Sequence, residues 1–191
     1  EAIGNYAFSY NSIVTLTIPN SVKTLGESAF HGCDNLSEVT IGNSVEIIES
    51  GTFRYCSNLC KVTIGQKVKT IGTYAFSDCT LLSSIEIGEA VQKIEDHAFD
   101  GCSNLGSITL PNTLMIIGDK AFRNTGLTSV KIPSSVVQIG TLAFNQCEAL
   151  KAITVDSNNP LFSDIDGVLC NKIKTTLYHY PNAKGSDYEI P

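Results

Sequence analysis

Cysteine is the residue type with the most reactive chemistry in this 191-residue chain, which contains seven of them. Cys60 and Cys170 stand apart, whereas the other five share a spacing of 23 residues or a multiple close to it: Cys33, Cys56, Cys79, Cys102 and Cys147. Zinc sites need closely spaced ligands, and the sequence has no C-x-x-C motif. Disulfides need a narrow geometry, and an odd number leaves one thiol over. We therefore expect no metal site and buried, reduced thiols in preference to disulfides, with Cys60 as the most exposed thiol.

An acidic stretch near the end of the chain, Asp164-Ile165-Asp166-Gly167, resembles the nucleophile loop of haloacid dehalogenase phosphatases. That loop follows an apolar parallel strand, whereas Pro160 and Ser163 interrupt the segment before this stretch. The carboxylates also lack the D-x-D-x-D-G spacing of an EF-hand calcium loop. We expect neither catalysis nor calcium binding there.

The three histidines, His31, His97 and His179, are scattered along the chain. No Ser or Cys stands at a repeated distance from them, as a nucleophile paired with its base would require. The glycines do not form the G-x-G-x-x-G pattern of a phosphate-binding loop. We therefore expect no enzyme activity and no cofactor.

Phenylalanine reveals the organisation of the chain, because seven of its eight copies recur every 22 or 23 residues: Phe8, Phe30, Phe53, Phe76, Phe99, Phe122 and Phe144. Ala precedes six of these rings, and an aliphatic residue stands five positions before each. The five recurrent Cys lie three positions after a ring, so both residue types belong to one structural ladder. A unit of this length cannot bury its apolar residues alone, which predicts that neighbouring units stack.

Each Phe is followed by a short stretch in which apolar and polar residues alternate, as in Val39-Thr40-Ile41. This alternation is typical of a half-buried strand. Gly or Pro then ends the stretch, since Pro lacks an amide donor and Gly allows the chain to turn. The sequence therefore predicts a solenoid with a parallel sheet along one side.

The pattern I-G-x-x-A-F-x-x-C-x-x-L-x-x-V-x-I-P, repeated over residues 1–156, resembles the BspA-like, or treponemal, leucine-rich repeat. The resemblance implies an α/β repeat solenoid, curved like a horseshoe. Short parallel strands would lie on the concave face, with turns or short helices around each Ala-Phe pair on the opposite side.

Residues 157–191 break the period, because Asn159 replaces the next ladder aliphatic and no Ala-Phe pair follows. Residues 168–170 and 176–178 flank a polar segment and predict a terminal β-hairpin. In the resembled family such segments lead into a further array, and residues 188–191 repeat the strand end at 17–19. We expect a repeat array at 1–156 and an irregular segment at 157–191, both cut from a longer protein.

Charge and composition narrow the classes of partner. Thirteen Lys and Arg against nineteen Asp and Glu give a net charge of −6, which disfavours nucleic acid and anionic lipid. No uncharged apolar run approaches the roughly 20 residues that cross a bilayer, so we expect no membrane insertion.

Polar positions of the predicted strands line up from repeat to repeat and form an outward face: Thr15, Thr17, Glu38, Thr40, Lys61, Thr63, Ser84, Glu86, Ser107, Thr109, Ser129 and Lys131. Thr and Ser suit an exposed strand, so this face could simply keep the sheet soluble. Alternatively, it is a flat docking face for a protein. It carries no aromatic residue, so useful affinity would need many weak contacts.

The resemblance implies a cell-surface or secreted protein whose relatives bind host matrix proteins or other cells. We therefore expect a non-catalytic adhesion module that binds a protein ligand and is monomeric. The alternative is a structural spacer or an intracellular interaction scaffold. Ice binding by the Thr column is disfavoured, because Glu86 and Lys131 interrupt it.

Overall fold

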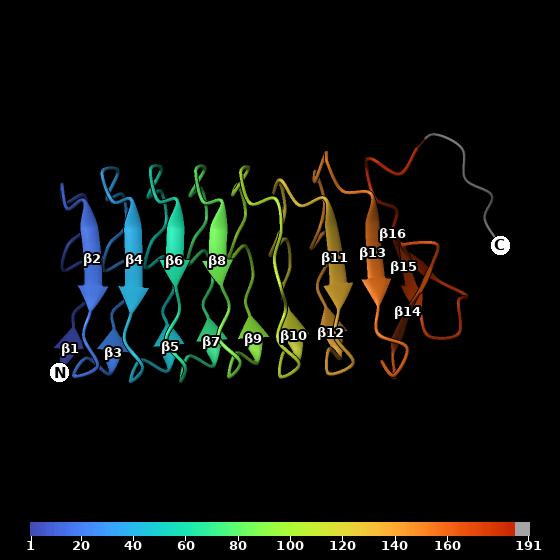
Figure 1. Ribbon diagram of the computed structural model, residues 1–191, viewed down its shortest axis with the longest axis horizontal. Coiled ribbons are helices and arrows are strands. Elements are labelled where there is room, and N and C mark those ends of the chain that lie inside the picture. The colour runs from blue at the N-terminus through green and yellow to red at the C-terminus, as the bar shows by residue number, and fades with distance from the viewer. Residues whose placement is uncertain (186–191) are drawn as a thin grey trace.

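A computed structural model describes residues 1–185 of the chain. The repeats lie side by side as rungs along the long axis, and a small antiparallel sheet follows the last rung (Figure 1). The strand end expected at residues 188–191 lies outside the described residues.

One side of the stack carries the longer strands. Four of them form a parallel sheet in the order β2 (Thr15–Ile18), β4 (Glu38–Ile41), β6 (Lys61–Thr63) and β8 (Ser84–Glu86). Farther along the stack, β11 (Ser129–Ile132) pairs with β13 (Ala152–Val155). The alternation in sequence has the expected result, because Val39 and Ile41 are buried while Glu38 and Thr40 are exposed.

A second ladder consists of two-residue strands just before each turn. Their order is β1 (Ala2–Ile3) with β3 (Thr24–Leu25), and β5 (Ile47–Ile48), β7 (Thr70–Ile71), β9 (Lys93–Ile94), β10 (Ile116–Ile117) and β12 (Gln138–Ile139). The second residue of each strand is the ladder aliphatic and faces the core. From β5 to β12 this ladder is continuous.

Residues 1–185 contain no helix, so the expected α/β class and the short helices around Ala-Phe are wrong. The backbone is left-handed two residues before and two residues after every ladder Phe: Tyr6, Tyr10, Ser28, Gly32, Gly51, Tyr55, Tyr74, Asp78, His97, Gly101, Lys120, Asn124, Leu142 and Gln146. Such residues interrupt a right-handed helix, and they favour tight turns with a positive φ at the third position.

The hydrogen bonds of these turns also exclude a helix. In the repeat of Phe76, the amides of Ala75 and Ser77 donate to carbonyls three residues earlier, at 3.1 and 3.2 Å. The amides of Tyr74 and Phe76 instead donate to carbonyls of the next rung, at 3.0 and 2.8 Å. An α-helix would need all of these amides for its own carbonyls. Alternate amides therefore join neighbouring rungs.

The Phe rings stack along the interior. Neighbouring ring centroids lie 5.2–5.6 Å apart, with interplanar angles of 3–8°. Six rings are buried, whereas Phe8 at the first rung is 40% exposed. The Sγ atom of each recurrent Cys donates to the Phe carbonyl of the preceding rung at 3.1–3.2 Å. The thiol column thus bonds to the ring column rung by rung.

The tail forms a three-stranded antiparallel sheet and not a simple hairpin. Its strands are β14 (Phe162–Ile165), β15 (Val168–Asn171) and β16 (Leu177–His179). The predicted hairpin corresponds to β15 and β16, and β14 is additional. Asp166 and Gly167 both have positive φ, as the two central residues of a type I′ turn require.

The tail sheet covers the open edge of β13. The amide of Ile153 donates to the Gly167 carbonyl, and the amide of Val155 donates to Asp164 Oδ1, both at 2.8 Å. Asn159 is fully buried, and its side chain bonds to two carbonyls of the preceding rung and two amides of the tail. These bonds give partners to backbone groups of β13 and of the adjoining turns that would otherwise lack them.

Candidate functional site

The structure brings the expected outward residues together in two groups, which we call the sheet face. In the first group, Thr15, Glu38, Lys61 and Ser84 align across β2, β4, β6 and β8, and so do Thr17, Thr40, Thr63 and Glu86. In the second, Ser129 and Lys131 lie on β11. All these side chains are exposed except Thr63, which is half-buried. Within the described residues, Lys131 alone has a side-chain partner, Asp156 at 3.8 Å.

Ser107 and Thr109 lie between the two groups, exposed but outside any strand. The continuous column expected from the sequence is therefore interrupted at this rung. Within residues 1–185, β8 pairs on one side only, with β6, and β11 pairs only with β13.

Gly106 accounts for the interruption on the side of β8. At the equivalent position of other rungs, Ser37, Cys60 and Ser83 each donate both the amide and the side chain to one carbonyl of the preceding rung. Thr128, at the next rung, makes both bonds to the carbonyl of Gly106 itself. Gly106 has no side chain to donate, and its amide makes no such bond in the described part of the chain. The link between the two rungs is lost here.

A hollow of about 290 Å³ lies where the strands separate. Ile85, Ile87 and Ile108 contribute apolar surface, and Glu86 and Glu89 are the acidic residues among those that line it. Ile87 is half-buried, although the equivalent Ile64 and other residues of its column are buried. The hollow is thus a local feature between two rungs of the sheet face.

A row of aromatic and charged side chains runs across the turns on another side of the stack, and we call it the turn edge. The His31 ring is edge-on to Tyr10 and Tyr55, with centroids at 5.3 and 5.4 Å. The Arg54 guanidinium lies over Tyr55 and Tyr74, at 4.6 and 4.4 Å from the ring centroids. This geometry is that of a cation held between two aromatic faces.

The turn edge continues into a buried carboxylate. Tyr74 stacks on His97 at 4.6 Å, and His97 Nδ1 lies 2.8 Å from Asp100 Oδ2. Arg123 binds Asp100 through Nε and Nη2, both at 2.9 Å. The hydrogen bonds to Asp100 raise the pKa of Arg123. Asp100 is 6% exposed, so this ion pair is shielded more than an ordinary surface pair.

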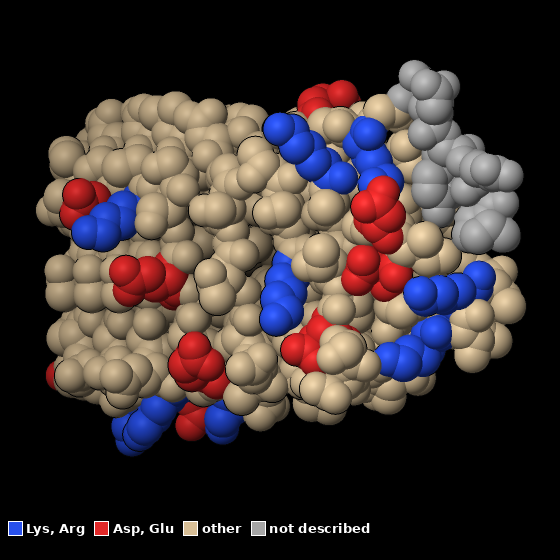
Figure 2. Space-filling view, turned by 45° about the vertical axis from the view of Figure 1, so that its right-hand side comes forward, with Lys and Arg blue, Asp and Glu red and all other residues tan. Residues whose placement is uncertain are grey.

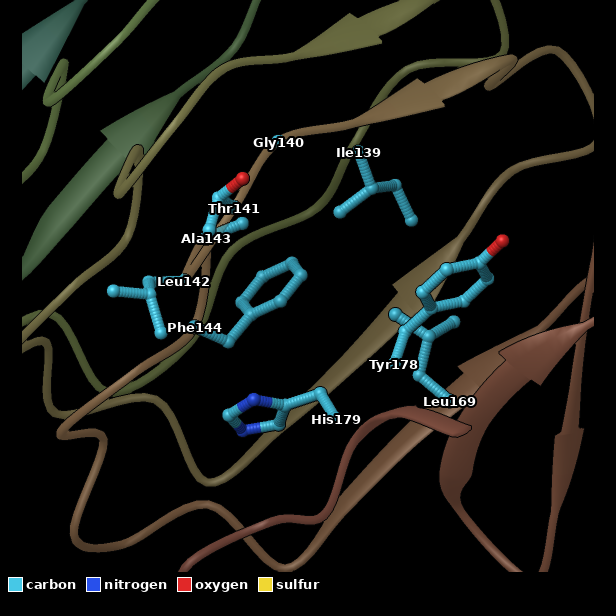
Figure 3. Close-up of a pocket in the computed structure, with 9 residues that line it drawn as sticks. All are labelled: Ile139, Gly140, Thr141, Leu142, Ala143, Phe144, Leu169, Tyr178 and His179. Atoms are coloured by element: carbon cyan, nitrogen blue, oxygen red, sulfur yellow. The ribbon is translucent and has the colours of Figure 1, made fainter. Parts of the chain in front are cut away.

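A pocket of about 320 Å³ lies between the last Phe and the tail sheet, as Figure 3 shows. Phe144, Ile139 and Leu169 give it apolar walls, and Tyr178 and His179 enclose it from β16. His179 Nε2 is buried and has no hydrogen-bond partner among residues 1–185. Burial lowers the pKa of His179, so its ring is neutral at pH 7.

Comparison with known proteins adds the family. Residues 1–102 and 79–174 match the BspA type leucine rich repeat region, in six copies. The chain belongs to this family. BspA-type repeats are typically non-catalytic modules that bind proteins. Among curated protein sequences, none matches this chain.

Solved structures of other bacterial proteins share the fold. A leucine rich cell surface protein of Faecalibacterium prausnitzii is 31% identical, with a TM-score of 0.80 over 95% of this chain and 50% of that chain. A leucine-rich repeat protein of Eubacterium ventriosum is 36% identical, with a TM-score of 0.76 over 80% and 41%. The pneumococcal vaccine antigen PcpA is 25% identical, with a TM-score of 0.61 over 100% and 44%. This chain spans half or less of each of them.

The thiols of this BspA-type array are structural. All seven cysteines are free, and Cys60 is the least buried, as expected from its strand position. Its Sγ atom nevertheless donates to the Ser37 carbonyl at 3.2 Å. Burial raises the pKa of Cys79 and Cys102, so both are protonated thiols at pH 7.

The carboxylates of the acidic stretch are occupied within the BspA-type fold. Asp164 accepts hydrogen bonds from the amides of Val155 and Gly167, and Asp166 pairs with Lys184 at 2.8 Å.

Within residues 1–185, no group of three or more His, Cys, Asp and Glu is arranged to hold a metal ion. The described residues also contain no helix of the length and hydrophobicity that would cross a bilayer. On the face that Figure 2 shows, acidic and basic side chains are dispersed among mostly uncharged residues.

Sequence analysis missed the turn edge, although a signal for it existed. His31, Arg54, Asp100 and Arg123 all stand one residue after a ladder Phe. Tyr6, Tyr74 and His97 all stand two residues before one. Aligning these positions from repeat to repeat, as was done for the strands, would have placed large polar and aromatic residues in adjacent rungs.

Proposed function

We propose that this chain is a non-catalytic binding module of a bacterial cell-surface protein and contributes to adhesion to host matrix proteins or other cells. The observation that supports this proposal is the sheet face. It extends across several rungs in register, and its side chains are almost all free to contact a partner. The description of the F. prausnitzii structure as a cell surface protein supports the location.

The sheet face suits broad and weak contact. Its side chains are mostly Thr and Ser, and it carries no aromatic residue in the strands described, so single contacts contribute little. Many such contacts add up when several copies bind one surface at once. Adhesion through many copies is therefore a better match than tight binding of one soluble ligand.

A spacer or an intracellular scaffold is the alternative function. The same lack of aromatic residues favours it, because a face of Thr and Ser also serves simply to keep a sheet hydrated. In that case the partner site belongs to another part of a longer protein.

Capture of bead-displayed protein on immobilised collagen, laminin and fibronectin tests the proposal. Wild type should be retained on at least one of these matrix proteins, and Thr40→Lys with Thr63→Lys should reduce retention several-fold. Tyr10→Ser with Tyr55→Ser on the turn edge is the matched control and should bind like wild type. Loss of retention in the control variant alone would indicate that the binding site lies on the turn edge. No retention of wild type on any surface would favour the spacer.

A further inference from the structure

We propose that the hollow beside β8 is an anchor site for one Arg or Lys side chain presented by a protein partner. This inference rests on the proposed function, since it assigns a partner chemistry to one place on the sheet face. The hollow lies between β8 and residues 107–109, where the sheet is interrupted.

The size and lining of the hollow match a long side chain. Its volume of about 290 Å³ is at the lower limit of pockets that take whole ligands, roughly 300 Å³. Ile87 and Ile108 remain half-buried beside it, so apolar surface is available to a ligand. The methylene groups of Arg or Lys pack well on such surface while the charged end stays near water.

The charge of the lining selects a cation. Glu86 and Glu89 are both exposed, and neither carboxylate has a hydrogen bond or ion pair within residues 1–185. No Lys or Arg lines the hollow. A cationic head group entering from the sheet face therefore meets two unpaired carboxylates, and the protein's net charge of −6 adds a longer-range attraction.

The open strand edges offer a second kind of contact. On the side of the hollow, β8 has no neighbouring strand within the described residues, and residues 107–109 form none. The two rungs stay joined by the second ladder and by the Phe76–Phe99 stack, so a whole strand does not fit between them. The unpaired backbone groups at the rim of the hollow can still make single hydrogen bonds to the partner residue that carries the cation.

Other positions on the sheet face lack this combination. Glu38 is also an exposed acidic residue of the sheet face, but its strand, β4, is paired on both sides, with β2 and β6. It provides charge without a hollow or an open edge. Glu38 is therefore the natural control for the effect of charge alone.

Titration of ¹⁵N-labelled protein with the peptide acetyl-Thr-Val-Arg-Val-Thr-amide, followed by NMR, tests the proposal. Amide shifts should be confined to residues 84–89 and 106–109. Replacing Arg by norleucine in the peptide, or Glu86→Gln with Glu89→Gln in the protein, should weaken binding about fivefold or more. Glu38→Gln should leave it unchanged. Shifts spread over the whole sheet face, or equal weakening by Glu38→Gln, would overturn the proposal.

Gly106→Ser provides an independent variant that leaves both carboxylates in place. A Cβ at Gly106 meets no atom closer than 4.0 Å, so Ser fits. We expect its hydroxyl to draw the two rungs together by donating to the Ser83 carbonyl, as Ser83 donates to the carbonyl of Cys60. Drawing the two rungs together should narrow the hollow and weaken binding of the Arg-containing peptide several-fold. Unchanged peptide affinity in a variant whose Ser107–Thr109 amides have become protected from exchange would contradict the proposed site.

The outcomes separate this inference from the proposed function. Matrix capture that survives Glu86→Gln with Glu89→Gln would leave the binding function intact and overturn the anchor site. Peptide binding with the expected variant pattern, without capture on any matrix protein, would support the anchor site and contradict adhesion to the matrix proteins used.

Discussion

The turn edge and the sheet face are built from the same repeats but use their side chains in opposite ways. On the turn edge, Tyr10, His31, Arg54 and Tyr74 contact residues of neighbouring rungs. On the sheet face, the exposed side chains are short or free, and the rungs are joined by backbone bonds beneath them. Side-chain contacts between rungs therefore add to stability on the turn edge, whereas backbone hydrogen bonds alone join the rungs on the sheet face.

This difference has a physical origin in the backbone. Left-handed turn residues lie on both sides of each ring, and their conformation is unfavourable for non-glycine residues by roughly 1 kcal/mol or more. Contacts across rungs offset that cost. Strand residues carry no such cost, so their outward side chains can change without loss of fold, which suits a binding surface.

The largest expected effect comes from the ring ladder beneath the turn edge. Phe76→Ala should lower the free energy of unfolding by about 3–5 kcal/mol, because it removes a fully buried ring stacked on both faces. Phe8→Ala should cost clearly less, since Phe8 is 40% exposed and stacks on one neighbour. Denaturant melts measure both. Equal midpoint shifts would show that the rings are not sheltered by their neighbours.

A smaller effect compares the two surfaces directly by the same acid-to-amide change. Asp100→Asn should cost about 1–3 kcal/mol, because the buried carboxylate binds Arg123 and His97. Glu38→Gln on the sheet face should stay within about 0.5 kcal/mol, because Glu38 is exposed and has no partner in the described structure. Thermal melts of both variants measure the contrast. Equal losses would mean that the sheet face also depends on its side chains.

Sequence analysis predicted the features that recur in every repeat and missed those that depend on bonds between particular neighbouring rungs. Period and alternation predicted the stacked repeats and the registers of β2, β4, β6 and β8, because those depend on burial that recurs in every unit. The prediction of short helices was wrong, because the Ala-Phe pairs do not reveal that alternate turn amides donate to carbonyls of the next rung. The hollow was also missed. Gly106 lacks the hydrogen bond to the preceding rung that Ser37 and Ser83 make, and the sequence alone does not show that this bond recurs.

Gly106→Ser tests whether the sheet face is weakened at one point. Gly106 has no positive φ, and its Cβ position is open, so Ser should raise the free energy of unfolding by about 0.4–1 kcal/mol. Hydrogen exchange should also show new protection at residues 107–109. Gly88→Ser is a contrasting variant, because a Cβ there meets the Gly65 carbonyl oxygen at 3.2 Å, and it should not stabilise. Destabilisation by Gly106→Ser would mean that the interruption has another cause.

The smallest expected effect is the part of the pH dependence that comes from the turn edge, since His179 in the tail pocket contributes in the same direction. Burial, and secondarily the charge of Arg54, lowers the pKa of His31 below its ordinary value of 6.5. Below about pH 6.5 the unfolded chain therefore binds a proton that the folded chain does not, so stability decreases as the pH is lowered. His31→Gln should flatten this part of the profile between about pH 7 and pH 5.5, measured by melts against wild type. An unchanged slope would show that the ring between Tyr10 and Tyr55 is hydrated like an ordinary sheet-face residue.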